Sequence, residues 1–376
     1  EAADEVGTSG AAIPLEITCD DEAAKIYGDP GTLPANKGEI IACTTDSPIS
    51  RDALQSTVDA NGYVGTTLTS GAEVYRVLYR TERGNDEPGY SSAIVYVPDT
   101  PRAEQLPVIV ASHGSRGQAP NCAPSLFHAD GDYVRIDFER LVFPLVGAGY
   151  AVIAPDLAGY ANYGAEGNPP SAYASAVDVS RSTLDGVKAL RNLIGPYLTD
   201  EVIVTGHSQG GHTALSTLAL AESYGVDGTL AGVVVYAPLW LSQRTWGAIF
   251  LLADSYPIAE SPVTSAVTVW YHYTHGELLD GAGHGLDVFQ EDERDSIKEF
   301  IDTSCWASSY PILESLGTLL TDLFDPSYTE SIKMPAALGT ECGDSASCNT
   351  WMDRFADDRP HIEDSAADVP LLFVYG

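Results

Sequence analysis

The chain has 376 residues, and its 53 Asp or Glu against 19 Lys or Arg give a formal charge of −34 at pH 7. A protein this acidic repels phosphate backbones and anionic head groups, so nucleic-acid binding is disfavoured. No apolar run approaches the roughly 18–20 residues that a membrane span needs, and we therefore expect no integral membrane segment.

The first part of the chain, residues 1–72, is rich in Gly, Pro, Asp and Thr, and we interpret it as a lead-in packed on the main domain. Its start, Glu1-Ala2-Ala3-Asp4, is typical of a mature N-terminus from which a signal peptide has been removed. Two segments with strand-like residue patterns follow, Glu73–Arg80 and Ser92–Val97, and the polar stretch between them predicts a hairpin.

From Pro107 onward, short apolar strands alternate with helical stretches. This order predicts a mainly parallel sheet covered by helices, because each return to a parallel strand needs a crossover. We assign residues 73–238 to this core. Its later elements are strand Val108–Ala111, a helical stretch to Val146, strand Ala151–Ala154, helix Ala174–Leu193, strand Val202–Thr205, helix His212–Tyr224 and strand Gly232–Tyr236.

After Pro238 the alternation stops. Residues 239–368 contain three predicted helical pieces, 245–253, 292–302 and 313–324, and no clear parallel strand. Val369–Tyr375 is again predicted as a buried strand, so residues 369–376 return to the core sheet. We interpret 239–368 as a helical lid insertion before that strand, on the sheet edge where substrates bind in such folds.

The sequence Gly206-His207-Ser208-Gln209-Gly210 matches Gly-x-Ser-x-Gly, the turn that carries the nucleophile in α/β-hydrolases. The motif requires a strand before the serine and a helix after it, and both are predicted here. We therefore predict an α/β-hydrolase fold in which Ser208 is the catalytic nucleophile. The alternative is a glycine-rich turn with an incidental serine.

A serine hydrolase also needs two hydrogen-bond donors for the oxyanion of its tetrahedral intermediate. One is expected to be the backbone N–H of Gln209, since N–H groups at a helix start have no intrahelical acceptor. The other is expected from the loop after the first parallel strand, where His113-Gly114-Ser115 lies, and we assign it to the backbone N–H of Ser115.

The acid and the histidine of the triad follow the serine in this fold. The acid normally comes after the strand that corresponds to 369–376, so we expect both partners beyond Gly376 and interpret the sequence as a fragment or the N-terminal piece of a cleaved chain. Other roles are expected for the histidines before that point: His113 bonds its own loop, His207 and His212 are too close to Ser208 in sequence, and His272, His275, His284 and His361 are surface or lid residues.

The six cysteines include no Cys-x-x-Cys pair and none beside a histidine at zinc-ligand spacing. This disfavours a metal site and favours structural disulfides formed in an oxidising compartment. We therefore expect a secreted protein, extracellular or periplasmic, with no metal and no cofactor. Six cysteines allow many pairings, and the sequence alone leaves the pairing open.

Several stretches resemble the secretory lipases of the type represented by Candida antarctica lipase A and its bacterial relatives. The resemblance extends from Tyr27 to the last residue, and its motifs together are more specific than Gly-x-Ser-x-Gly alone. They are Tyr27-Gly28-Asp29-Pro30 with Gly38-Glu39-Ile40-Ile41, Val77-Leu78-Tyr79-Arg80-Thr81, Asn121-Cys122-Ala123-Pro124-Ser125, Ala151–Tyr160, and Leu184-Asp185-Gly186 with Ala189-Leu190.

The resemblance implies a lipase or esterase that acts on small-molecule or lipid esters through Ser208, with the insertion as its lid. It also implies a bridge between Cys122 and Cys305, and it leaves Cys19 with Cys43 and Cys342 with Cys348 as local bridges.

Three alternatives remain open. The His-Ser-Gln elbow, common in the bacterial relatives, leaves a general esterase or polyesterase in place of a lipase. A peptidase or amidase would share Ser208 and the sheet, and a non-catalytic α/β-hydrolase-like protein is favoured only by the absent acid and base.

Within the insertion, four apolar residues form either the entrance above Ser208 or the insertion's own core. They are Trp246, Ile249, Phe250 and Leu251.

Overall fold

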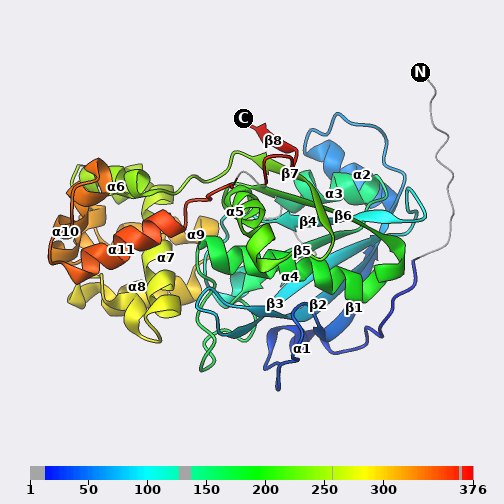
Figure 1. Cartoon of the computed structure of the whole chain (residues 1–376), viewed down its shortest axis with the longest axis horizontal. Helices are drawn as coiled ribbons and strands as arrows, with labels where there is room; N and C mark the ends of the chain where they lie inside the picture. Colours follow the sequence, from blue (N-terminus) through cyan, green and yellow to red (C-terminus); the bar gives the residue numbers. More distant parts are fainter. Residues whose placement is uncertain (1–12, 127–136, 256, 364–365, 376) are drawn as a thin grey trace.

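The computed structural model describes residues 13–126, 137–255, 257–363 and 366–375. The expected mature start, Glu1–Asp4, and the last residue, Gly376, lie outside the described residues, as does part of the helical stretch predicted before Val146. Figure 1 shows two parts, a twisted sheet with helices on both faces and a group of helices at one end of it.

Eight strands form a single sheet in the order β1-β2-β3-β5-β4-β6-β7-β8. The pairs β1–β2, β2–β3 and β3–β5 are antiparallel, whereas β5, β4, β6, β7 and β8 are parallel to one another. The predicted mainly parallel sheet is therefore confirmed. The strands are β1 (Ile40–Ile49), β2 (Ala72–Glu82), β3 (Pro88–Pro98), β4 (Leu106–Ser112), β5 (Val152–Ala158), β6 (Leu198–His207), β7 (Thr229–Tyr236) and β8 (Leu371–Val374).

Helices cover the sheet because apolar side chains recur along one side of each helix. On one face, α4 (Ala176–Ile194) and α5 (Gln209–Tyr224) bury residues such as Val187 and Leu215 against the strands. On the other, α2 (Arg51–Ala60) and α3 (Phe143–Gly147) pack into a second core. A short helix, α1 (Ala23–Tyr27), lies beside β1 and β2. The two cores fix the sheet from both sides.

The remaining helices form their own core at the end of the sheet (Figure 1). Its centre is a helix whose residues from Ser265 to Gly276 are all buried. Trp246 and Phe250 are fully buried in this core, while Leu251 is 45% exposed. Of the two predicted roles, the entrance above Ser208 or the core of the insertion, Trp246 and Phe250 therefore have the second. The helices are α6 (Gln243–Leu252), α7 (Pro262–Leu279), α8 (Arg294–Thr303), α9 (Trp306–Leu316), α10 (Pro326–Leu338) and α11 (Ala346–Asp357).

Three predicted segments differ from the structure. Residues 40–49, assigned to the lead-in, form β1 and belong to the sheet. The helix predicted over 313–324 is wrong in its second half: α9 ends at Leu316, and the Asp322 side chain instead accepts N–H groups of the following turn. The strand at 369–375 is not buried, because β8 lies at the sheet edge, and its Leu372 is 56% exposed.

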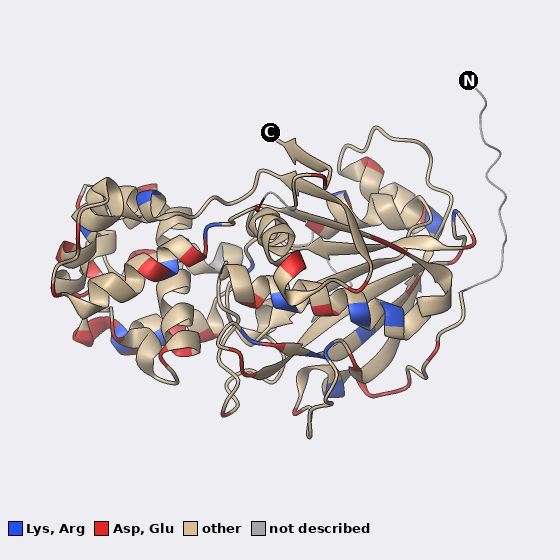
Figure 2. Ribbon diagram, viewed as in Figure 1, with Lys and Arg blue, Asp and Glu red and all other residues tan. Residues whose placement is uncertain are grey.

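Acidic side chains occur on both parts of the molecule rather than in one tail or patch (Figure 2). Such a distribution favours solubility over a single binding surface for a polycation. Among the helices within the described residues, none has the length and apolar character needed to cross a membrane.

Three disulfides are present: Cys19–Cys43, Cys122–Cys305 and Cys342–Cys348. These are the pairs that the resemblance implies. Cys122–Cys305 joins the loop after β4 to the residue before α9, across a sequence separation of 183. It therefore links the sheet part covalently to the helical part.

Removing this long-range bridge is expected to destabilise the protein more than removing the most local one. Cys122→Ser with Cys305→Ser should lower the free energy of unfolding by about 3–5 kcal/mol, because the loop that the bridge closes is long. Cys342→Ser with Cys348→Ser, which opens a separation of only 6 residues, serves as the control. Chemical denaturation measures both, and an equal or larger loss in the control would contradict this prediction.

Candidate active site

Ser208 lies on a sharp turn between β6 and α5. The strand ends at His207, the helix begins at Gln209, and Ser208 between them has φ 55° and ψ −114°. A non-glycine residue with positive φ costs on the order of 1–3 kcal/mol and persists only where its surroundings impose it. This is the strand–turn–helix geometry that the motif requires of a nucleophile.

The flanking glycines are needed because the backbone crowds at this turn. A Cβ at Gly210 would lie 2.0 Å from the Ser112 carbonyl oxygen, and a Cβ at Gly206 would lie 2.1 Å from the Gly210 carbonyl oxygen. Both distances are far inside van der Waals contact. The start of α5 therefore packs directly on the end of β4.

Hydrogen bonds to the end of β7 hold the turn in place. The N–H of Ser208 donates to the Tyr236 carbonyl over 3.0 Å, and the Ser208 carbonyl accepts the N–H of Leu239 over 2.8 Å. These bonds fix the strained backbone, while the Ser208 side chain remains partly exposed.

The loop after β4 lies against the same turn. Ser112 pairs with Gly206 in the sheet, and an added Cβ at Gly114 would lie 3.3 Å from the His207 ring. Next in this loop, the Ser115 hydroxyl is 2.5 Å from the Tyr173 hydroxyl. The sheet thus brings the loop that contains Ser115 beside the first turn of α5. That the N–H groups of Gln209 and Ser115 bind an oxyanion stays a prediction.

His113 is a buried member of this loop. Its ring nitrogens lie 2.7 Å from the Gly114 carbonyl oxygen and 3.2 Å from the Asp156 carbonyl oxygen. Burial, followed by the nearby Arg116, lowers the pKa of His113. These contacts agree with its expected role in bonding its own loop.

His207, beside the nucleophile, bonds to a carboxylate that the sequence did not reveal. Its Nδ1 lies 2.9 Å from Oδ1 of Asp137, whose Oδ2 accepts the Gly114 N–H over 2.9 Å. The hydrogen bond to Asp137 raises the pKa of His207 above 6.5. Burial pushes the pKa of Asp137 upward, but the bond and charge of His207 outweigh it and leave that pKa lowered. No motif surrounds Asp137, so only the fold could identify it.

The helical part contains a second histidine–carboxylate pair, also absent from the sequence analysis. Nε2 of His275 lies 2.7 Å from Oδ2 of Asp358, and its Nδ1 lies 2.7 Å from the Tyr271 carbonyl oxygen. Asp358 also accepts the Ala176 N–H, so it connects α7 to the start of α4. Since both ring nitrogens of His275 are occupied, this buried residue has no nitrogen free for Ser208.

The other histidines have separate surroundings. His272 is buried among aromatic rings, and burial lowers its pKa to about 3. His361 bonds to the Ala356 carbonyl oxygen, His284 pairs with Asp287, and His128 lies outside the described residues. Within the described part of the chain, none of the hydrogen bonds joins a histidine to the Ser208 hydroxyl.

The same fold and turn recur in known proteins. The family model described as "Alpha/beta hydrolase family" matches residues 108–363, which include the whole elbow. The chain belongs to the alpha/beta hydrolase family. A search of curated protein sequences finds no match.

Solved structures of esterases and lipases share the fold of this alpha/beta hydrolase. The rice cell wall degrading esterase LipA from Xanthomonas oryzae aligns with a TM-score of 0.66 and 17% identity, covering 91% of this chain and 83% of that chain. Candida antarctica lipase A in its closed state aligns with a TM-score of 0.61 and 16% identity, covering 93% of this chain and 74% of that chain. The resemblance to lipases of that type is confirmed at the level of the fold.

The pair His207–Asp137 should make the stability of this hydrolase depend on pH. Because the folded pKa of His207 is raised above 6.5, the pair's contribution is complete below that pH and is lost as the pH rises through the folded value. The folded pKa of Asp137 is lowered below 3.8, so the contribution is also lost at strongly acidic pH. His207→Gln should therefore destabilise the protein at about pH 5 and much less near pH 8.5.

Urea denaturation at the two pH values measures this difference, and His361→Gln is the exposed control. A destabilisation by His207→Gln that grows with pH would contradict the assignment.

Proposed function

We propose that the chain is a secreted serine carboxylic-ester hydrolase, a lipase or esterase, that forms an acyl-enzyme on Ser208. The observation that carries this proposal is the strained backbone of Ser208 between β6 and α5. Glycine is the usual residue where a turn needs a positive φ, because it adopts that conformation without strain. A serine there presents its hydroxyl at the edge of the sheet.

In the proposed reaction, Oγ of Ser208 attacks the ester carbonyl carbon and its proton passes to a histidine base. The alcohol leaves with that proton, and water then hydrolyses the acyl-enzyme. The backbone N–H of Gln209 and that of Ser115 are proposed to bind the oxyanion. The packing of Gly210 on Ser112 supports this assignment, because it sets the two segments side by side.

The acid and the histidine of the triad are proposed to follow Gly376. β8 is parallel to β7 and β6, so its carboxyl end lies at the same sheet edge as Ser208. A carboxylate a few residues later would be well placed to orient an imidazole toward Oγ. Translation of the gene past this codon tests the point directly.

Residues 239–368, which contain α6 to α11, are proposed to act as a lid over a small-molecule or lipid ester. The chain enters this segment just after β7, at the sheet edge where Ser208 lies, and returns from it to the amino end of β8. The esterase and lipase structures that share the fold support this substrate class. The three disulfides support secretion.

Replacing the nucleophile should abolish the reaction. Ser208→Ala in the full-length protein is expected to lower kcat by about 10⁴-fold or more, because the triad acts as a unit. A fluorophosphonate probe should label Ser208 and nothing else, as peptide mapping will show. The matched control is Ser223→Ala, a serine near the other end of the same helix α5, which should keep full activity and labelling. Labelling of another residue would refute the assignment.

A substrate panel separates the ester hydrolase from the other reactions of this fold. p-Nitrophenyl esters should be cleaved and peptide anilides should not. A peptidase would need groups that bind the terminus of a peptide substrate, and no residue of the proposed site is assigned to that role. Preferential cleavage of the anilides would favour a peptidase or amidase, and inertness toward both would favour a binding protein.

A further inference from the structure

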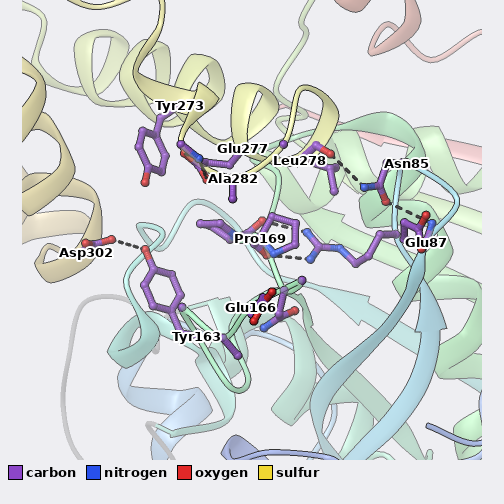
Figure 3. Close-up of a pocket in the computed structure, with 18 of the residues that line it drawn as sticks. Asn85, Glu87, Tyr163, Glu166, Pro169, Tyr273, Glu277, Leu278, Ala282 and Asp302 are labelled. Carbon is purple, nitrogen blue, oxygen red and sulfur yellow. Dashed lines mark hydrogen bonds between the residues drawn. The ribbon is translucent and has the colours of Figure 1, made fainter. Parts of the chain in front are cut away.

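A cavity of about 540 Å³ opens between the sheet part and the helical part (Figure 3). Its walls come from the β2–β3 hairpin, from the loop after β5, and from α7, α8 and the turn between them. This volume is typical of sites for small molecules, which span roughly 300–1,000 Å³.

The cavity is separate from Ser208. The hairpin that lines it connects β2 to β3, and β3 is three strands away from β6 in the sheet order. At about 4.8 Å a strand, that places it roughly 14 Å along the same sheet edge. No residue of the elbow or of the loop 113–118 is among its lining residues in the described part of the chain.

A nearly buried tyrosine lines this cavity. Tyr273 of α7 is only 3% exposed, and no hydrogen bond within the described residues involves its hydroxyl. Figure 3 shows its ring extending from α7 toward the side of the cavity where Tyr163 donates to Asp302. This hydroxyl is not among the buried polar atoms that lack a partner, so it is open to solvent and available to a ligand.

The two cationic side chains in the walls are each paired with a carboxylate. Arg83 pairs with Asp178 and donates to the carbonyls of Pro169 and Pro170. Lys298 pairs with Asp302, and the Asn85 amide donates to the Leu278 carbonyl. Both cations in the described lining are therefore paired with carboxylates, and only the ammonium of Lys298 keeps further N–H groups for a ligand.

The acceptors, by contrast, remain available. Glu87 and Glu166 make no side-chain hydrogen bond or ion pair with the described residues, and both are exposed at the cavity. Glu277 accepts the N–H groups of Gly283 and Gly285, which fixes its carboxylate but leaves further lone pairs free. Unpaired negative charge and free acceptors select a cation that carries N–H donors, and they repel carboxylates and phosphates.

The rest of the lining is apolar and aromatic. Pro169, Leu278 and Leu286 offer hydrocarbon surface, and the faces of Tyr163 and Tyr273 suit a cation or a ring. We propose that this cavity is a binding site for a small organic cation, a protonated amine on an apolar body. The ammonium group donates to Glu277 and to the Tyr273 hydroxyl, and the body packs on the prolines and leucines.

Calorimetric titration at low salt with three matched probes tests the charge requirement. 2-Phenylethylamine is protonated at pH 7, 2-phenylethanol is neutral, and 3-phenylpropionate is anionic. The amine should bind with one site per chain and at least tenfold more tightly than the alcohol, and the acid should not bind. An absence of saturable binding by the amine, or equal affinity of the alcohol, would overturn the proposal.

Variants then locate the site. Glu277→Gln should weaken amine binding at least about fivefold, and Ala282→Trp, an exposed position on the cavity wall, should block it by filling the space. Glu260→Gln, an exposed glutamate outside the cavity, is the control and should bind within twofold of the wild type. Since Ala282 is exposed, its variant tests the site even where Glu277→Gln disturbs the turn. Unchanged binding by both cavity variants would refute the location, whatever the outcome at Ser208.

Discussion

The close approach of the α5 backbone to the end of β4 is the constraint on which the rest of the molecule depends. Gly210 fits against the Ser112 carbonyl only because it has no side chain. This contact sets the helix start over the sheet edge, forces Ser208 into its strained conformation and places the next loop beside it. A small steric requirement thus determines where Ser208 lies relative to the sheet and to the next loop.

The joint between the sheet and the helical part depends on buried polar groups rather than on apolar packing alone. Within the sheet part, beside this joint, Arg83 and Asp178 are both almost completely buried, and their charges are paired and hydrogen-bonded, as burial requires. Asp358 likewise bonds to His275, Tyr271 and the Ala176 N–H. Removing a partner of Asp358 would leave a buried charge without compensation, so its contacts hold α7 against the start of α4.

The sequence predicted those parts of the fold that are marked by residue patterns within one short segment. The short apolar strands and the Gly-x-Ser-x-Gly turn sufficed for the parallel sheet and for the position of Ser208. They failed for α7, because a helix buried on all sides shows no polar face, and for β1, whose Ile40-Ile41-Ala42-Cys43 run lacks alternation. Asp137 and Asp358 could not be found either, since only tertiary folding brings each to its histidine.

The disulfide between Cys122 and Cys305 limits how the helical part can move. Its two Cα atoms are 5.5 Å apart, and a backbone bridge between Gly117 and Cys305 adds a second tether at the same point. A rotation of the helices about these tethers would move the start of α9 least. The widest displacement falls on α6 and α10, which pack on each other and lie at the far end of the helical part (Figure 1). The two tethers thus hold the residue before α9 next to the loop that carries Ser115.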